Sequence, residues 1–199
     1  MAHKISAIVL AAGASRRMGT CKQLLPLGDK PTIVHCLETI IASDINEIIV
    51  VTGANGDDVA AAISRFPVKI VRVTALGGDM ADSVRIGLGE VSCGHSAVMI
   101  CLADQPLVAK STCLQLSRQH AVTPDDILIP VFKEQKGHPT IFPVGLLKPL
   151  SAGWTLRDVI HNNPQHVRLL ESNDQGVVLD MDFPSEYQAM REYFTGNNK

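Results

Sequence analysis

Residues 5–22 read Ile-Ser-Ala-Ile-Val-Leu-Ala-Ala-Gly-Ala-Ser-Arg-Arg-Met-Gly-Thr-Cys-Lys, an apolar run followed by a small and then basic loop. The run from Ile5 to Leu10 predicts a short buried strand. Small residues such as Gly13 let backbone N–H groups approach an anion, and Arg17 and Lys22 carry charges that neutralise one. The stretch therefore outlines a phosphate-binding loop. The alternative is an ordinary strand-to-helix turn with solvated charges.

The rest of the chain repeats this alternation of apolar runs and helical periods. Short runs rich in Ile and Val predict strands near residues 5–11, 47–52, 69–73, 97–102 and 127–130. The segments between them predict helices near 31–42, 56–65, 79–90 and 110–120. Because the strand segments are apolar at nearly every residue, we expect them to be buried on both faces of a sheet. The fold class is therefore α/β, with a mainly parallel sheet.

The pattern changes after residue 130. A polar turn at 133–137 predicts a hairpin, so we expect a small β excursion at about 131–143. Short helices around 144–150 and 155–162, strand-like segments at 166–171 and 176–180, and a helix from Pro184 to about 194 complete the expected elements. The sequence contains no repeat, low-complexity tract or linker, so residues 1–199 are expected to form a single domain.

Composition narrows the classes of function. Of the 199 residues, 46% are hydrophobic and 19% are charged, as in globular proteins. The net charge of −2 argues against a nucleic-acid partner. The apolar runs are too short to cross a membrane and the N-terminus lacks a signal-peptide pattern, so we expect no membrane partner and a cytoplasmic location. The five cysteines show no CxxC spacing, which argues against a zinc site and against a disulfide framework.

A second polar element follows the expected strand at 97–102. Asp104 lies two residues beyond this strand, and Pro106 ends the extended segment. Open α/β sheets bind ligands at the carboxyl ends of their strands, so Asp104 is a candidate ligand-binding residue. The alternative is that Asp104 caps the helix that follows.

Four motifs together resemble one protein family. They are the loop Leu-Ala-Ala-Gly-x-Ser-x-Arg-Met-Gly-x-x-Lys at 10–22, Leu-Ala-Asp-Gln-Pro at 102–106, Gly-His-Pro at 137–139 and Asp-Met-Asp-Phe-Pro at 180–184. They are similar to motifs of the molybdenum cofactor cytidylyl- and guanylyltransferase-like NTP transferases, and the Ala-Ala-Gly form is nearer the cytidylyl branch. The resemblance implies a Rossmann-like three-layer sandwich of the nucleotide-diphospho-sugar transferase type.

The resemblance also implies roles for individual residues. Lys22, Arg17 and Asp104 would be the catalytic residues. The acceptor substrate would be bound by His138 and Arg157, although a structural histidine and a surface arginine are the alternatives. Contacts with the nucleotide are implied for Leu10, Ala11, Ala12, Gly13, Arg17, Lys22, Gly78 and Ser83.

The same resemblance implies a metal site for Mg²⁺. Asp104 would hold the ion on the triphosphate, because a hard cation prefers carboxylate and phosphate oxygens. Asp180 and Asp182 are candidates for a second ligand, since residues two apart on a strand point to the same side. Asp182 fits the N-cap of the helix that begins at Pro184. Asp180 has no such role and would cost desolvation without a cation, so we favour Asp180 as the second ligand.

The implied reaction is nucleotidyl transfer. An ionised phosphate on the acceptor attacks the α-phosphorus of a nucleoside triphosphate, and pyrophosphate leaves. The resemblance favours CTP and molybdopterin as substrates, with a molybdoenzyme or its chaperone as a further candidate partner. One alternative is transfer to an isoprenoid, alditol or sugar phosphate. Another is a nucleotide- or pterin-binding chaperone without turnover, for which the departures from the family pattern at Asp79, Trp154 and Phe183 argue.

Overall fold

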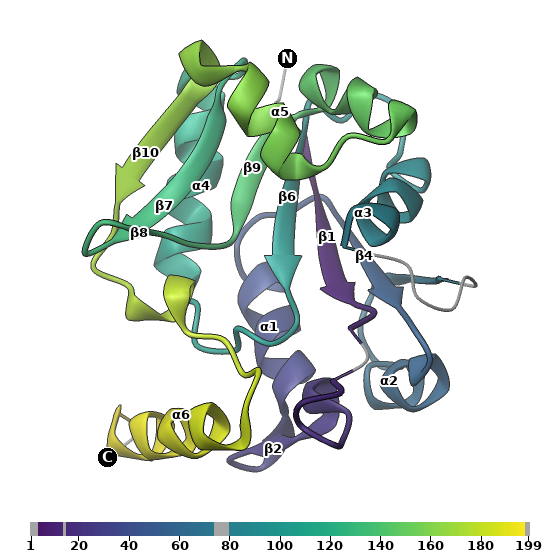
Figure 1. Cartoon of the computed structure of the whole chain (residues 1–199), viewed down its shortest axis with the longest axis vertical. Helices are drawn as coiled ribbons and strands as arrows, with labels where there is room; N and C mark the ends of the chain where they lie inside the picture. The colour runs from purple at the N-terminus through teal and green to yellow at the C-terminus, as the bar shows by residue number, and fades with distance from the viewer. Residues whose placement is uncertain (1–3, 14, 74–79, 198–199) are drawn as a thin grey trace.

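The apolar runs of the sequence form a sheet that crosses the middle of the molecule (Figure 1). The computed structural model describes residues 4–13, 15–73 and 80–197. The strands predicted from the first five runs are all present, together with the one expected at 166–171. They are β1 (Ile5–Ala11), β4 (Glu47–Thr52), β5 (Lys69–Arg72), β6 (Ala97–Leu102), β7 (Ile127–Phe132) and β10 (Val167–Glu171).

The order of strands in this sheet is β10-β7-β9-β6-β1-β4-β5. β1 pairs in parallel with β4 and β6, β4 with β5, and β7 with β10. β9 (Thr140–Pro143) runs antiparallel between β6 and β7, and β8 (Gln135–Lys136) forms a hairpin with β7. The segment expected as a small β excursion therefore supplies a strand of the main sheet, which is otherwise parallel.

Helices cover both faces of the sheet, as a three-layer sandwich requires (Figure 1). α1 (Thr32–Ile41), α2 (Gly56–Ala62) and α4 (Lys110–Val122) pack on one face. α3 (Met80–Gly89), the 3-10 helix η2 (Val144–Ala152) and α5 (Leu156–Asn162) pack on the other. Ile8 and Ile49 on one face and Val9 and Val50 on the other are fully buried, which explains why the central strands are apolar at nearly every position. The mainly parallel α/β fold expected from the sequence is confirmed.

One strand prediction is wrong. Residues 176–180 do not form a strand; the short 3-10 helix η4 (Gln175–Val178) occupies most of this segment. The carboxylate of Asp174 accepts a hydrogen bond of 2.9 Å from the N–H of Gly176 and so starts the turn. A Cβ atom on Gly176 would overlap the carbonyl of Leu107, so only glycine lets the chain pass this close. These two local features outweigh the strand preference of Val177 and Val178.

The chain ends in α6 (Pro184–Asn197), which lies at the carboxyl end of the central strands in Figure 1. It packs on a small antiparallel pair formed by β2 (Pro26–Leu27) and β3 (Lys30–Pro31), which follow the 3-10 helix η1 (Lys22–Leu24). Buried Leu27, Met181 and Met190 form this contact. The last helix therefore rests directly against the segment that follows the glycine-containing loop. The 3-10 helix η3 (Pro164–His166) precedes β10.

Among the described residues, none of the helices combines the length and the apolar character needed to span a membrane.

Candidate functional site

The carboxyl ends of β1 and β6 lie side by side and bring the two polar elements of the sequence together. Leu10 pairs with Leu102 at the end of these strands, and the N–H of Ala103 donates to the carbonyl of Leu10. The loop after β1 carries Arg17 and Lys22, and the turn after β6 carries Asp104. This edge of a parallel sheet is where the fold class binds ligands.

Ser15 organises the loop between β1 and η1. Its carbonyl accepts the N–H groups of Met18 and Gly19 at 3.0 and 3.1 Å, and its hydroxyl accepts the N–H of Lys22 at 3.2 Å. Ser15 and Gly19 have φ values of 49° and 68°, so the loop makes two left-handed bends. The sequence motif indicated small residues here, but it did not show that Ser15 ties the loop to the basic residue at its end.

Lys22 lies at the centre of the site. Its Nζ atom donates to the carboxylate of Asp104 and, at 2.8 Å, to Oδ1 of Asp182. The side chains of Lys22 and Asp104 are only 11% and 15% exposed. Burial alone would lower the pKa of Lys22, but the charges of Asp104 and Asp182 outweigh burial and raise it. Lys22 is therefore a permanent cation held between two carboxylates.

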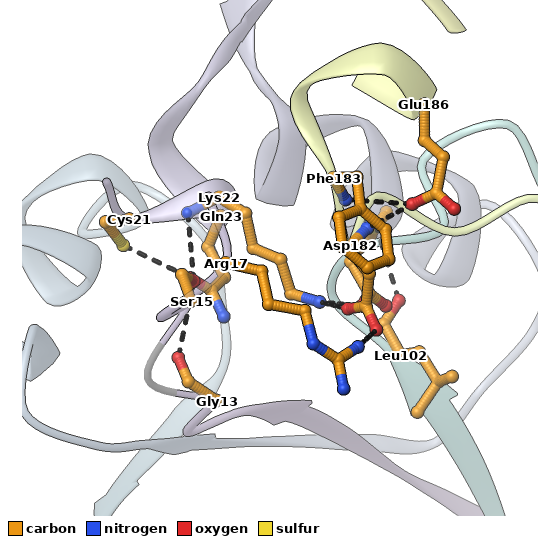
Figure 2. A network of polar contacts seen from close by, with 12 residues as sticks. Gly13, Ser15, Arg17, Cys21, Lys22, Gln23, Leu102, Asp182, Phe183 and Glu186 are labelled. Atoms are coloured by element: carbon orange, nitrogen blue, oxygen red, sulfur yellow. Dashed lines mark hydrogen bonds and ion pairs between the residues drawn. The ribbon is translucent and has the colours of Figure 1, made fainter. Parts of the chain in front are cut away.

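Arg17 forms the outer part of the same cluster. Its guanidinium donates to Oδ2 of Asp182 at 2.9 Å and lies over the ring of Phe183, 5.3 Å from the ring centre. Figure 2 shows the side chains of Arg17 and Lys22 converging on Asp182 from one side. Arg17 stays 63% exposed, so its charge faces solvent and can reach a ligand. The neighbouring Arg16 is exposed.

The two acidic residues near the C-terminus differ from the expectation. Asp182 does not cap α6; the cap is Glu186, whose Oε2 atom accepts the N–H groups of Asp182 and Phe183 at 2.7 and 2.9 Å. The carboxylate of Asp182 instead joins the cluster, and hydrogen bonds from Lys22 lower its pKa. The argument from a shared strand face fails because residues 180–182 are not in a strand.

Asp180 lies close to the same charges, but its side chain makes no hydrogen bond or ion pair with the described residues. Its pKa is raised, first by burial and then by the negative charges of Asp104, Asp182 and Glu186. Several carboxylates thus crowd this edge of the sheet, which is a setting that a divalent cation would stabilise. Within the described ranges, however, no group of three or more His, Cys, Asp or Glu side chains is placed to hold a metal alone. A metal here would need oxygen atoms from a bound phosphate.

The other predicted site residues lie in different settings. The main-chain N–H of His138 donates a hydrogen bond of 2.9 Å to the carbonyl of Val177. The Nδ1 atom of its ring is buried without a hydrogen-bond partner among the described residues. Burial lowers the pKa of His138, whereas the carbonyl of Ile100 and the charge of Asp104 raise it less. The ring is therefore neutral at neutral pH and lies near Asp104.

Ser83 is buried on α3, at 6% exposure, and Arg157 is exposed on the first turn of α5. The contacts of the described residues do not join Arg157 to the cluster. Leu10, Ala11, Ala12 and Gly13 form the end of β1 and the start of the loop. Gly78 lies outside the described residues.

Comparison with known proteins places this geometry in context. Residues 7–170 match the family model described as the MobA-like NTP transferase domain, which covers β1 through most of β10. The matched segment includes Arg17, Lys22 and Asp104 but ends before Asp182. Three of the four charged residues in the cluster therefore come from the part that the family model covers.

Two curated relatives carry different names. The chain is 26% identical to nicotine blue oxidoreductase of Paenarthrobacter nicotinovorans, over 89% of this chain and 92% of that protein. It is 30% identical to a probable molybdenum cofactor guanylyltransferase of Natranaerobius thermophilus, over 66% of this chain and 62% of that protein.

A solved structure is similar over nearly the whole chain. The structure of Rv0371c from Mycobacterium tuberculosis in complex with manganese superposes with a TM-score of 0.81 at 26% identity, covering 96% of this chain and all of that one.

Proposed function

Because the chain belongs to the MobA-like NTP transferase family, we propose that it transfers a nucleoside monophosphate from a nucleoside triphosphate to a phosphorylated acceptor. The observation that carries this proposal is the placement of Arg17 and Lys22, which converge at the carboxyl edge of the sheet beside Asp104. Two cations that face one small region match the several negative charges of a polyphosphate better than they match a ligand with a single negative charge.

A carboxylate occupies the position where we expect a phosphate group of the ligand to bind. The carboxylate of Asp182 accepts hydrogen bonds from both Arg17 and Lys22, which are the groups that would bind phosphate oxygens. A triphosphate would displace Asp182 from these cations. Lys22 and Arg17 would then stabilise the negative charge that grows on the pyrophosphate as it leaves. This step needs positioning and charge neutralisation rather than a covalent intermediate.

The residues around Lys22 fit a divalent cation, with Mg²⁺ as our candidate. Asp104 and Asp182 would hold it, since both carboxylates now contact one ammonium group and Mg²⁺ commonly takes one or two carboxylates plus substrate phosphates. When bound, the ion would polarise the α-phosphate and neutralise charge on the triphosphate. Lys22 would move from the carboxylates to the phosphates, so the site exchanges one set of ion pairs for another.

For the substrates, we infer CTP and molybdopterin from the motifs at 10–22 and 137–139, and from the similarity to a molybdenum cofactor guanylyltransferase. An acceptor phosphate is ionised at neutral pH, so the reaction requires no general base. His138 and Arg157 stay our candidates for acceptor binding. His138 would act through its position beside Asp104, because its Nδ1 atom is buried.

A second candidate function rests on one comparison. The relative named nicotine blue oxidoreductase aligns over 92% of its length, so this fold also carries an activity with an oxidoreductase name. In that case Arg17 and Lys22 would bind the pyrophosphate of a redox cofactor, for example a nicotinamide dinucleotide, and transfer of a hydride from the reduced cofactor to an acceptor would replace nucleotidyl transfer.

One assay separates the two candidates. Each of the four nucleoside triphosphates is mixed with Mg²⁺ and the protein, and tested with molybdopterin and with isoprenoid, alditol and sugar phosphates. Release of pyrophosphate that needs both substrates supports nucleotidyl transfer. Oxidation of a reduced nicotinamide cofactor by a heteroaromatic acceptor, without pyrophosphate release, supports the oxidoreductase. Nucleotide binding without either reaction would indicate a binding protein.

A further inference from the structure

The turn that leads into α6 is held by one side chain. Oε2 of Glu186 accepts the N–H groups of Asp182 and Phe183, at 2.7 and 2.9 Å. The side chains of the same two residues contact the basic loop, since Asp182 binds Arg17 and Lys22 and the ring of Phe183 lies beneath Arg17. Figure 2 shows Glu186 on one side of this turn and Arg17 and Lys22 on the other.

The residues on either side of the turn are fixed by burial, but the turn itself is not. Met181 is fully buried before the turn, and Met190 is 3% exposed on α6 after it. Between them, Asp182 is 42% exposed at its side chain and Phe183 is 46% exposed. Packing therefore fixes the two ends, whereas the direction of the Asp182 carboxylate depends on the main-chain hydrogen bonds to Glu186.

We propose that Glu186 is a positioning residue that aims the carboxylate of Asp182 at the cation and metal region of the site. This inference rests on the proposed function for the ligands concerned. Glu186 does not touch the phosphate or the metal; it acts by holding the backbone of Asp182. A partner of this kind, one shell behind a metal ligand, commonly changes metal affinity when it is removed.

A purely structural role makes a different prediction. If Glu186 only capped α6, its loss would lower the melting temperature and leave ligand affinity unchanged. The chain offers a matched control in Asp158. Its Oδ2 atom accepts the N–H of Thr155 at 2.8 Å at the start of α5. Each acidic side chain thus accepts main-chain hydrogen bonds at the start of a helix, from two N–H groups for Glu186 and from one for Asp158. The turn held by Asp158, however, does not carry a residue of the Lys22 cluster.

The test measures Mn²⁺ binding in the presence of pyrophosphate, by the loss of the free-ion electron paramagnetic resonance signal beyond that of a protein-free mixture of Mn²⁺ and pyrophosphate. Wild type, Glu186→Ala, Glu186→Gln and Asp158→Ala are compared, each with its melting temperature. We expect Glu186→Ala to weaken Mn²⁺ binding about tenfold. Glu186→Gln should recover most of this, because its amide oxygen can accept the same N–H groups. Asp158→Ala should lose stability only.

The outcomes are separable. Unchanged Mn²⁺ affinity in Glu186→Ala, with a melting temperature lowered as in Asp158→Ala, would show that Glu186 is a helix cap and overturn the inference. Wild-type protein that binds neither Mn²⁺ nor pyrophosphate would overturn the proposed function, and this inference with it. If Glu186→Ala does not fold, Glu186→Asp carries the same expectation, since its carboxylate is drawn back by one methylene.

Discussion

Two polar clusters lie at opposite ends of the sheet and differ in how completely their charges are matched. At the amino end, Glu47 accepts hydrogen bonds from Ser6 at 2.7 Å and from Ser92 at 2.6 and 3.0 Å, and Lys69 lies 2.7 Å away. Burial alone would raise the pKa of Glu47, but the bonds from Lys69, Ser92 and Ser6 outweigh it and lower the pKa to about 2. Lys69, Ser92 and Ser6 therefore all favour the ionised form of Glu47.

In the cluster at the carboxyl end, the surroundings shift the pKa values of two neighbouring carboxylates in opposite directions. The pKa of Asp182 is lowered by Lys22, whereas the pKa of the nearby Asp180 is raised by burial and by the other carboxylates. Arg17 and Asp182 remain largely exposed, so their ion pair is open to competition from a ligand. A cluster with matched charges stabilises the fold. A cluster with unmatched charges at the ligand-binding edge is suited to exchange partners.

The largest expected effect comes from removing the cation of the second cluster. Lys22→Ala should lower kcat/KM for nucleotidyl transfer, because a charge-assisted contact with phosphate is lost. The decrease should correspond to about 2–4 kcal/mol of lost transition-state stabilisation. The matched control is Lys69→Ala, which removes the cation paired with Glu47 and should lower the melting temperature without changing kcat/KM. Equal kcat/KM for Lys22→Ala and wild type would exclude Lys22 as a residue that binds the phosphates.

Glu47→Gln should disrupt the first cluster and lower the free energy of unfolding by about 2 kcal/mol at neutral pH. This value is reduced for screening by solvent at the amino end of the sheet. Because the folded-state pKa is lowered to about 2, the stabilisation is complete above the ordinary pKa of 4.5 and is lost as pH falls from there toward 2. Urea unfolding of both proteins between pH 7 and about 2 checks this. A difference that stays constant through that range would contradict the account.

A comparison of Asp182→Asn with Asp180→Asn sharpens the assignment of the second metal ligand. We expect Asp182→Asn to raise the Mg²⁺ concentration needed for half-maximal activity about tenfold, because an amide keeps the shape but loses the charge that holds a hard cation. Asp180→Asn should change this concentration little and should leave the melting temperature equal or higher, since it removes a carboxylate crowded by like charges. The opposite pattern would restore Asp180 as the ligand.

The smallest expected effect concerns the ring beneath Arg17. Phe183→Leu keeps an apolar side chain but removes the cation–π contact, which is worth about 0.5–1 kcal/mol at an exposed site. We expect a two- to fivefold increase, on that scale, in the KM for the nucleoside triphosphate with kcat unchanged. Phe66→Leu, which removes a similar contact with Arg65 away from the site, is the control. Identical KM values for Phe183→Leu and wild type would show that the ring does not orient Arg17.

The sequence predicted the parallel strands and the position of Asp104 at the carboxyl end of β6, because continuous apolar runs mark buried strands and parallel sheets bind ligands at that edge. It did not predict the direct contact between Lys22 and Asp104. It favoured Asp180 as the second metal ligand and did not predict that Asp182, rather than Asp180, is held by Arg17 and Lys22. That choice depends on Gly176, whose close contact with Leu107 turns an expected strand into a 3-10 helix, and on Glu186, which takes the capping role expected of Asp182. The contact of Gly176 with Leu107 joins segments that are far apart in the sequence, so spacing along the chain does not reveal it. The contact of Glu186 is local, three and four residues from its partners, and the sequence argument overlooked it.

The roles of Ser15 and Phe183 were also missing from the sequence argument. Ser15 matched the motif, but its use as a hydrogen-bond partner of Lys22 is a property of the folded loop. Phe183 was noted only as a departure from the family pattern, whereas the structure gives it a contact with Arg17.

The most direct test of the account follows a radiolabelled α-phosphate from each nucleoside triphosphate into the acceptor, in the presence of Mg²⁺. We predict that wild type and Lys69→Ala transfer the label and release pyrophosphate, and that Lys22→Ala is slower by about a hundredfold. Label that stays in the triphosphate with every base and acceptor, or transfer by Lys22→Ala at the wild-type rate, would contradict the central claim that this basic loop binds a triphosphate for nucleotidyl transfer.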